Sequence, residues 1–213
     1  MRDAVRQAYD EIAEEYAGAS DDVAEAAPLL DPFSKRLEAG SRILDVGCGD
    51  GSPVSAHLGN RFDVVGIDIS REQLRLATER VPETALLQGE MTALPIETAS
   101  VEAVLAFYSI IHVPRSEHQS VFEEWARVLE PGGWVLFSSG EEAWDGRNLD
   151  WLDTGVEMVW SYPGPEETRA GLEKAGFRVE SDQPVPDSLA DAGAKRFFLA
   201  QFDPEPINEP PRK

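Results

Sequence analysis

Ile43-Leu44-Asp45-Val46-Gly47-Cys48-Gly49-Asp50-Gly51 is the most informative stretch of this 213-residue chain. An apolar strand runs into a glycine-rich turn, where the backbone must bend sharply and lie against a ligand without a Cβ in the way. A second apolar strand, 64–67, ends in Asp68, which lies 21 residues after Gly47. In a βαβ unit this is the place of an acidic side chain that binds ribose hydroxyls. The two segments together predict an adenosine-type ligand.

The glycine turn differs from the dinucleotide-binding pattern G-x-G-x-x-G. Its third fingerprint position is Ser52, and Asp45 and Asp50 add two negative charges at the turn. These charges would repel a diphosphate, which normally lies at the N-terminus of the following helix. They suit a ligand that carries an ammonium and a sulfonium group. The segment resembles motif I of the class I S-adenosylmethionine-dependent methyltransferases.

The resemblance continues from about residue 5 to residue 202, nearly the whole chain. It implies an α/β fold of the Rossmann-like methyltransferase type, with a seven-stranded, mostly parallel sheet, an antiparallel last strand and helices on both faces. The segments similar to the family's further motifs are 66–70 (second motif), 88–95 (third motif), 101–112 (fourth strand and the loop beside the methyl group) and 125–133 (the turn before the fifth strand).

The same resemblance implies S-adenosyl-L-methionine as the cofactor and assigns residues to it. Asp45 is expected to support its ammonium group and Asp68 to bind both ribose hydroxyls. Glu90 occupies the position whose acidic residue, usually Asp in the family, contacts the adenine amino group. The expected cofactor-binding set, with no metal ligand, is Tyr16, Asp45, Gly47, Cys48, Gly49, Asp68, Ile69, Glu90, Met91 and Phe107.

His112 and Tyr108 are the candidate catalytic residues, because they follow the fourth strand, where the family's loop faces the transferable methyl group. A histidine with a pKa near neutrality could take a proton from a hydroxyl or amine nucleophile. The alternatives are a loop histidine that caps the helix after Pro114 and a tyrosine that only forms a wall. Tyr9 stays open between a core anchor and a neighbour of the cofactor. The other two histidines, His57 and His118, are predicted at the helix surface without a role.

Length and composition suit one domain, at 1–203, followed by a flexible, proline-rich tail at 204–213. The resemblance implies that an N-terminal helical cap at 1–40 closes over the cofactor. Helices are expected at 3–17, 22–38 (interrupted), 70–80, 115–130 and 165–175. Strands are expected at 42–46, 63–67, 84–88, 101–107, 134–139, 177–182 and 196–202.

An insertion at 141–163 holds Trp144, Trp151 and Trp160, three of the five tryptophans. It follows the carboxyl end of the fifth expected strand, beside the ligand crevice of an open α/β sheet. Aromatic side chains there would line a pocket for a planar or apolar substrate. The alternative is that they only pack the insertion onto the sheet edge.

Charge and composition limit the cellular environment and the substrates that we expect for this protein. Forty acidic residues against 19 basic ones give a net charge of −21. This excess destabilises a compact state by self-repulsion unless salt screens it, so we predict a halophile's high-salt cytoplasm, with an ordinary acidic cytosolic protein as the alternative. The charge also disfavours substrates with a phosphate backbone.

The single cysteine, Cys48, excludes a disulfide framework and is predicted to be a packing residue. The chain shows no apolar signal region and no run of about 18 apolar residues, so neither export nor a membrane partner is expected. The expected location is the cytoplasm.

The function expected from these features is S-adenosylmethionine-dependent methyl transfer by in-line displacement to a small molecule. Nucleic acid is not an expected partner, and the acceptor and the oligomeric state stay open. Two other classes remain as alternatives: a non-catalytic protein that binds S-adenosylmethionine or S-adenosylhomocysteine, and a NAD-dependent oxidoreductase.

Overall fold

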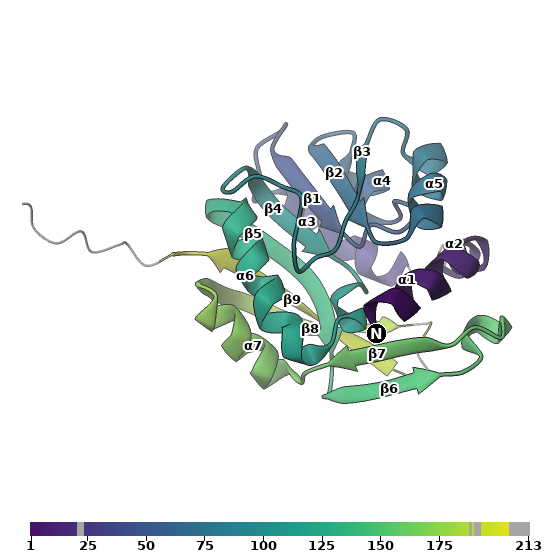
Figure 1. Cartoon of the computed structure of the whole chain (residues 1–213). Coiled ribbons are helices and arrows are strands. Elements are labelled where there is room, and N and C mark those ends of the chain that lie inside the picture. The colour runs from purple at the N-terminus through teal and green to yellow at the C-terminus, as the bar shows by residue number, and fades with distance from the viewer. Residues whose placement is uncertain (21–23, 188, 190–192, 205–213) are drawn as a thin grey trace, which may run out of the picture.

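Seven strands form one sheet: β1 (Arg42–Val46), β2 (Asp63–Asp68), β3 (Ala85–Gln88), β4 (Val101–Ala106), β5 (Leu129–Gly140), β8 (Phe177–Asp187) and β9 (Gly193–Phe202). The computed structural model describes residues 1–20, 24–187, 189 and 193–204. The strand order is β3-β2-β1-β4-β5-β9-β8 (Figure 1). Neighbours are parallel except at β9, which runs antiparallel to both β5 and β8. The predicted fold class is confirmed.

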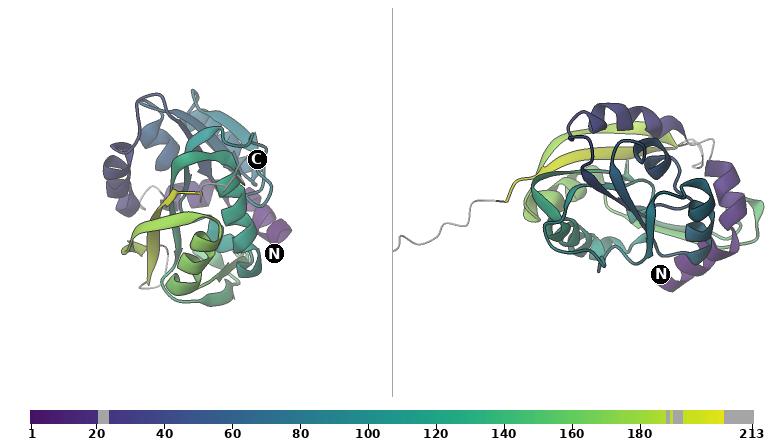
Figure 2. Two further views of the ribbon diagram at one scale, coloured as in Figure 1. Left: turned by 90° about the vertical axis from the view of Figure 1, so that its left-hand side faces the viewer. Right: turned by 90° about the horizontal axis from the view of Figure 1, so that it is seen from above.

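Helices cover both faces of this sheet (Figure 2). One apolar core lies between the sheet and the pair α6 and α7, around the fully buried Trp125 and Phe137. A second core lies under α3 and α4, around Phe33, Leu58 and Phe197. The helices are α1 (Arg2–Glu11), α2 (Ala13–Ser20), α3 (Leu30–Ser34), α4 (Val54–Leu58), α5 (Arg71–Arg80), α6 (His118–Val128) and α7 (Pro165–Lys174), with short 3-10 turns η1 (Ala24–Leu29), η2 (Ile110–His112), η3 (Arg115–Glu117) and η4 (Trp151–Asp153).

The strand order reverses between β1 and β4, so the connections from these two strands leave toward opposite faces of the sheet. In open α/β sheets such a switch point opens a crevice at the carboxyl ends of the strands. The glycine turn leaves β1 at this place, Asp68 ends β2, and η2 follows β4. The topology therefore brings the motif residues to one edge of the sheet.

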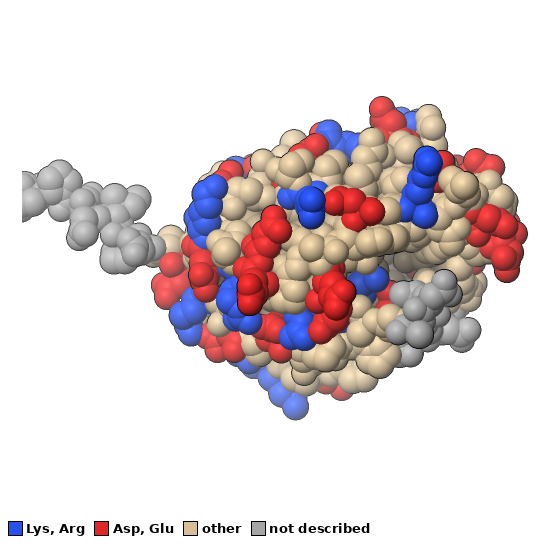
Figure 3. Space-filling model, turned by 90° about the horizontal axis from the view of Figure 1, so that it is seen from below, with Lys and Arg blue, Asp and Glu red and all other residues tan. Residues whose placement is uncertain are grey.

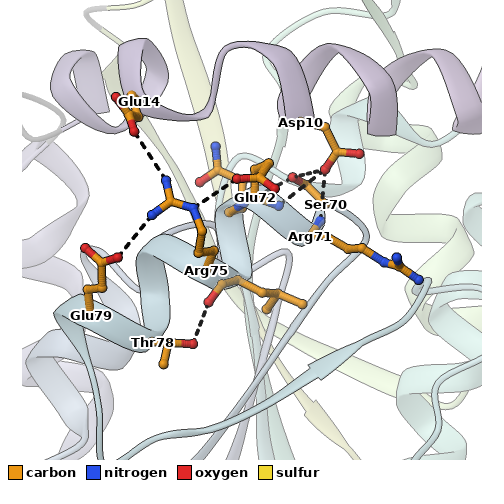
Figure 4. Close-up of polar contacts among 10 residues, drawn as sticks. Asp10, Glu14, Ser70, Arg71, Glu72, Arg75, Thr78 and Glu79 are labelled. Carbon is orange, nitrogen blue, oxygen red and sulfur yellow. Dashed lines mark hydrogen bonds and ion pairs between the residues drawn. The ribbon is translucent and has the colours of Figure 1, made fainter.

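The N-terminal helices are held on α5 by polar contacts (Figure 4). Asp10 of α1 accepts hydrogen bonds at Oδ1 from Ser70 Oγ at 2.7 Å and from the Arg71 amide at 2.9 Å. Arg75 of α5 reaches back to Glu14 of α2, with 3.3 Å between Nη2 and Oε1. Asp10 thus serves as an additional cap for the N-terminus of α5, beside Ser70, whose Oγ accepts from the Gln73 amide at 3.2 Å.

The insertion folds into a two-stranded antiparallel hairpin, β6 (Trp144–Asn148) and β7 (Met158–Tyr162), which the sequence did not predict. In Figure 1 the hairpin extends beneath α1. Val5, Ala8 and Ile12 of the N-terminal segment form a third small core with Trp151 and Met158 of the insertion. Two segments about 140 residues apart in sequence therefore pack together over the edge of the sheet.

Element boundaries differ from prediction in several places, among them β8 and β9, which are longer than the strands expected at 177–182 and 196–202. The expected helix 3–17 breaks at Ile12, whose φ of −109° ends α1. The expected segment 22–38 is a 3-10 turn followed by a short helix, and residues 21–23 lie outside the described chain. Helix α6 begins only at His118, and β5 begins at Leu129 because that residue already pairs with Val101 of β4. Most of the expected tail, 205–213, also lies outside the described residues.

Candidate active site

A cavity of about 940 Å³ lies at the carboxyl ends of β1, β2 and β4. Its walls come from the glycine turn, from η2, from α1 and α2, and from the β6–β7 hairpin. Every residue expected to bind the cofactor lines it, and so do both candidate catalytic residues: Tyr16, Asp45, Gly47, Cys48, Gly49, Asp68, Ile69, Glu90, Met91, Phe107, Tyr108 and His112.

Two glycines of the turn are needed for different reasons. Gly47 has a φ of +76°, and a Cβ there would overlap the Ser109 side chain. Gly49 has a φ of +54°, but a Cβ there would meet only Gln73 Oε1, at 3.6 Å. Close internal packing therefore requires Gly47, whereas the space beside Gly49 opens into the cavity.

Asp68 is fixed by the turn that it faces. Its Oδ2 accepts a hydrogen bond from the Gly49 amide at 2.9 Å, and its Oδ1 accepts one from the Ser70 amide at 2.8 Å. Burial raises the pKa of Asp68 to about 6, although these amides favour the ionised form. Each carboxylate oxygen has a second lone pair, so a ligand hydroxyl can still donate to it.

Asp45 is more deeply buried, at 2% exposure. Its Oδ2 accepts a hydrogen bond from Ser55 Oγ at 2.7 Å. Burial raises the pKa of Asp45 to about 7, and the nearby charge of Asp68 adds to this rise. A ligand with positive charge would relieve both effects, because an opposite charge stabilises a buried carboxylate.

Cys48 and Gln73 complete this end of the cavity. Burial raises the pKa of the Cys48 thiol, and the neighbouring carboxylates raise it further, as suits a packing residue and not a nucleophile. Gln73 is 1% exposed, and neither heteroatom of its side chain has a hydrogen-bond partner among the described residues. Because buried polar groups are normally paired, this amide is suited to a polar ligand group.

Glu90 lies at the rim of the cavity and not in its depth. Its side chain is 37% exposed, and its Oε2 lies 2.7 Å from Nη1 of Arg2 on α1. The second guanidinium nitrogen of Arg2 binds Glu117 at 2.7 Å. The candidate adenine contact is therefore tied to the N-terminal helix.

His112 differs from the sequence expectation. It is buried, and burial lowers its pKa to about 4, with a smaller contribution from the positive charge of Lys195. Its Nδ1 donates to the Val159 carbonyl at 2.8 Å, which leaves Nε2 to accept from the Tyr9 hydroxyl at 2.9 Å. The predicted pKa near neutrality is therefore wrong, and so is the capping alternative, because the ring links the hairpin to α1.

Tyr108 has the left-handed conformation, with a φ of +53°. Its amide donates to Ser138 Oγ at 2.6 Å, and its ring meets the edge of Phe197 at 5.6 Å between centroids. A tyrosine in this region is uncommon, and such backbone strain often occurs at functional sites. The interaction with β5 and β9 holds the residue at the cavity wall.

Aromatic rings from three segments surround the other end of the cavity. Tyr9 lies 5.0 Å from Tyr16 and 5.8 Å from Trp151, measured between ring centroids. Trp160 lies 5.6 Å from both Trp151 and His112. All three tryptophans of the insertion line the cavity. Tyr9 packs against the third small core and also lines the cavity, so the roles of core anchor and cofactor neighbour do not exclude each other.

Sequence reasoning missed two residues of this site, Lys195 and Asp187, and misplaced His118 outside it. Lys195 and Asp187 line the cavity from β9 and β8 and form an ion pair, with 3.3 Å between Nζ and Oδ2. No local motif marks either residue. His118, predicted at the surface, is 3% exposed and bonds to the Val113 carbonyl at 3.1 Å.

In the described ranges, no group of three or more His, Cys, Asp and Glu side chains could hold a metal ion. None of the described helices combines the length and apolar character that a membrane crossing requires.

The chain is similar in sequence to known methyltransferases. A family model described as a methyltransferase domain matches residues 43–133. The 27-O-demethylrifamycin SV methyltransferase of Amycolatopsis mediterranei is 34% identical over 164 residues, which are 70% of this chain and 58% of that protein. The tRNA (carboxymethyluridine(34)-5-O)-methyltransferase of Mus musculus is 27% identical over 97% of this chain, but only 27% of that protein is covered. This chain therefore spans less than two thirds of the length of either relative.

The fold also matches solved structures. An S-adenosylmethionine-dependent methyltransferase from Methanosarcina mazei superposes with a TM-score of 0.69 at 19% identity. The match covers 81% of this chain and 97% of that one. At this identity the likeness concerns the fold alone.

Proposed function

We propose that this chain, which belongs to the class I S-adenosylmethionine-dependent methyltransferases, transfers the methyl group of S-adenosyl-L-methionine to a small-molecule acceptor. When bound, this cofactor supplies an electrophilic methyl group on a sulfonium. For in-line displacement the protein must align the acceptor with this methyl group and keep water out of the site. The observation that carries the proposal is one cavity with two buried carboxylates at one end and an aromatic wall at the other.

The carboxylate end fits the cofactor. Asp68 offers acceptor positions for the ribose hydroxyls, and the Gln73 amide offers both a donor and an acceptor beside the open space at Gly49. Asp45 places negative charge where an ammonium group would be stabilised. Ionised Asp45 and Asp68 would together balance the positive charge of the ligand.

The aromatic end fits the acceptor. Tyr9, Trp151 and Trp160 present apolar area for a planar or apolar molecule and exclude water. His112 is neutral at physiological pH and its Nε2 already accepts a hydrogen bond from the Tyr9 hydroxyl, so we assign it the role of positioning Tyr9. Tyr108 remains the candidate for direct contact with the acceptor.

The proposal extends to the organisation of the domain. Residues 1–40 would act as a cap over the cofactor, and residues 141–163 would form the acceptor side. The support is that both segments line the cavity and pack on each other.

A small acceptor is favoured over RNA, although the mouse relative is a tRNA methyltransferase by name. The walls of the cavity come from both ends of the chain and enclose a volume suited to one cofactor and one small molecule. On the face drawn in Figure 3, the basic side chains of the described residues lie among acidic ones and do not gather into a continuous patch. With a net charge of −21, a phosphate backbone has little to bind.

Calorimetric titration with S-adenosylmethionine, S-adenosylhomocysteine and NAD tests the cofactor. We expect the first two to bind and NAD not to bind. Asp68→Asn should weaken both adenosyl ligands by about tenfold or more, because ribose hydroxyls lose a charged acceptor. Asp63→Asn is the matched control, since Asp63 begins the same strand and is half exposed against Arg42. Binding of NAD alone would contradict the proposal.

Methyl release separates an enzyme from a sensor. The protein would be incubated with cofactor labelled in the methyl group and with a panel of small metabolites or with bulk tRNA. Labelled small products would support the proposal. Label found only in tRNA would show that the acceptor is RNA and not a small molecule. Tight cofactor binding without transfer to either acceptor would favour the non-catalytic alternative.

A further inference from the structure

A buried ion pair lies in the cavity at a distance from the carboxylates Asp45 and Asp68, which are expected to hold the cofactor. The side chains of Lys195 and Asp187 are 9% and 7% exposed. Burying a lysine costs several kcal/mol unless it is paired, and an apolar residue would fill the same space more cheaply. We therefore ask whether this pair binds a ligand.

The sheet places this pair on the acceptor side. Lys195 of β9 stands opposite Gly140, the last residue of β5. Between β9 and β1, which carries Asp45, lie β5 and β4. Three strand spacings amount to about 14 Å. Lys195 is thus far along the cavity from the carboxylates assigned to the cofactor.

Lys195 is the buried cation of the cavity. Arg2 and Arg147 also line it, but their side chains are 43% and 65% exposed and bind surface glutamates. The described contacts of Lys195 Nζ are the Asp187 carboxylate and the face of Tyr162, whose ring centroid lies 5.4 Å away. An ammonium group has three N–H donors, so a ligand oxygen can be added to these contacts.

The surroundings of Lys195 are flat and aromatic. The Tyr162 ring that it faces lies 5.9 Å from Trp144, and Trp144 lies 5.9 Å from Trp160. Trp160 in turn meets His112, whose pKa is lowered mainly by burial and in smaller part by the charge of Lys195. A ring that stacks among these side chains would carry its substituents next to the ammonium group.

We propose that Lys195 binds an ionised oxygen, carboxylate or phenolate, on an aromatic acceptor. This inference rests on the proposed function, because it identifies the chemistry of the acceptor. In the cavity interior such a charge pair is worth more than in water, since few water molecules screen it.

Both oxygens of Asp187 already have protein partners, and a cationic acceptor at this carboxylate is the competing assignment that the ammonium probe below tests. Its Oδ2 faces Lys195, and its Oδ1 accepts a hydrogen bond from the Leu189 amide at 3.2 Å. An ammonium group placed at Asp187 would also lie beside the positive charge of Lys195. The role of Asp187 is to hold the Lys195 side chain in the cavity.

Three probes of one shape test the charge preference: 2-naphthoate, 2-naphthamide and 2-naphthylmethylammonium. Each is titrated calorimetrically into the full chain saturated with S-adenosylhomocysteine, after binding of S-adenosylhomocysteine has itself been measured. The variants are Lys195→Met, Lys195→Arg and the double variant Lys195→Met with Asp187→Asn, which leaves no unpaired buried charge. Lys174→Met, at an exposed position that ends α7, is the matched control.

We expect wild-type protein to bind naphthoate about tenfold or more tightly than naphthamide, with the ammonium probe weakest. Lys195→Met and the double variant should lose this preference, Lys195→Arg should keep most of it, and Lys174→Met should keep it fully. Binding of S-adenosylhomocysteine should change less than about twofold in every variant.

Several results would overturn the inference. They are equal binding of naphthoate and naphthamide, no binding of naphthoate, tightest binding of the ammonium probe, and a preference for naphthoate that survives in the double variant. Loss of S-adenosylhomocysteine binding in Lys195→Met would instead place Lys195 in the cofactor site. If wild-type protein bound no S-adenosylhomocysteine, the proposed function itself would fail, and the two failures are thereby distinguished.

Discussion

Replacing Asp45 with Asn should stabilise the ligand-free protein at pH 8 far more than at pH 5. Burial raises the pKa of Asp45 from 3.8 to about 7. The carboxylate is 2% exposed and has Ser55 Oγ as a hydrogen-bond donor, but no cation pairs with it among the described residues. At about 1.4 kcal/mol per pKa unit, ionising Asp45 costs the folded state about 4 kcal/mol more than the unfolded state.

The direction of this pH dependence follows from proton linkage. A carboxyl group whose folded pKa is raised contributes stability that is fully present below pH 3.8 and is lost as the pH rises to about 7. Between pH 5 and pH 8 the wild-type protein should lose about 3 kcal/mol through Asp45. Asp45→Asn has no proton to release, and its amide oxygen can still accept from Ser55.

Urea unfolding at pH 5 and pH 8, at one KCl concentration, measures this effect. The difference in unfolding free energy between Asp45→Asn and wild type should grow by about 3 kcal/mol from the lower to the higher pH. Asp63→Asn, at the exposed start of β2, should show no such growth. The stabilised variant should nevertheless bind S-adenosylmethionine more weakly, because the ammonium group loses its counter-charge. An equal difference at both pH values would refute the reasoning from the buried charge.

Three further predictions concern other parts of the molecule. Asp10→Ala should lower the unfolding free energy by about 1 kcal/mol through loss of the α5 cap, with Glu11→Ala, exposed on the same helix, as the control in urea unfolding. The pKa of His112 is lowered from 6.5 to about 4, so its contribution to the unfolding free energy is present above pH 6.5 and is lost as the pH falls toward 4. The unfolding free energy of wild type should therefore fall by about 2 kcal/mol relative to His112→Gln between pH 7 and pH 5. A difference that stays constant over this range would contradict the prediction. The melting temperature should rise by about 5–10 °C between 0.1 M and 2 M KCl, because salt screens the net charge of −21, and a melting temperature independent of KCl would count against adaptation to high salt.

Much of the cofactor end could be predicted because its signal is local. A strand, a turn with positive φ at Gly47 and Gly49, and an acid at the end of the next strand are encoded within 26 residues, from Ile43 to Asp68. Parallel pairing of β1 and β2 then brings the turn and Asp68 together without further information. The lining of the cavity matched prediction most fully here.

The acceptor end could not be predicted in the same way. Tyr9 and His112 are 103 residues apart, and their hydrogen bond exists only because the hairpin and α1 pack together. The burial that lowers the pKa of His112 is a property of this packing, so the residue type alone suggested the wrong protonation behaviour. Lys195 and Asp187 carry no motif at all and meet because β8 and β9 pair.

The amino-acid sequence alone was sufficient to predict the class of fold, the family resemblance and the position of the glycine turn. These features depend on backbone conformation and hydrophobic periodicity, which neighbouring residues determine. The directions in which the pKa values of Asp45 and His112 shift, the arrangement of the aromatic wall and the burial of Lys195 follow only from the tertiary structure. Burial, dielectric environment and hydrogen-bond partners depend on which distant segments come into contact, and no short stretch of chain contains that information.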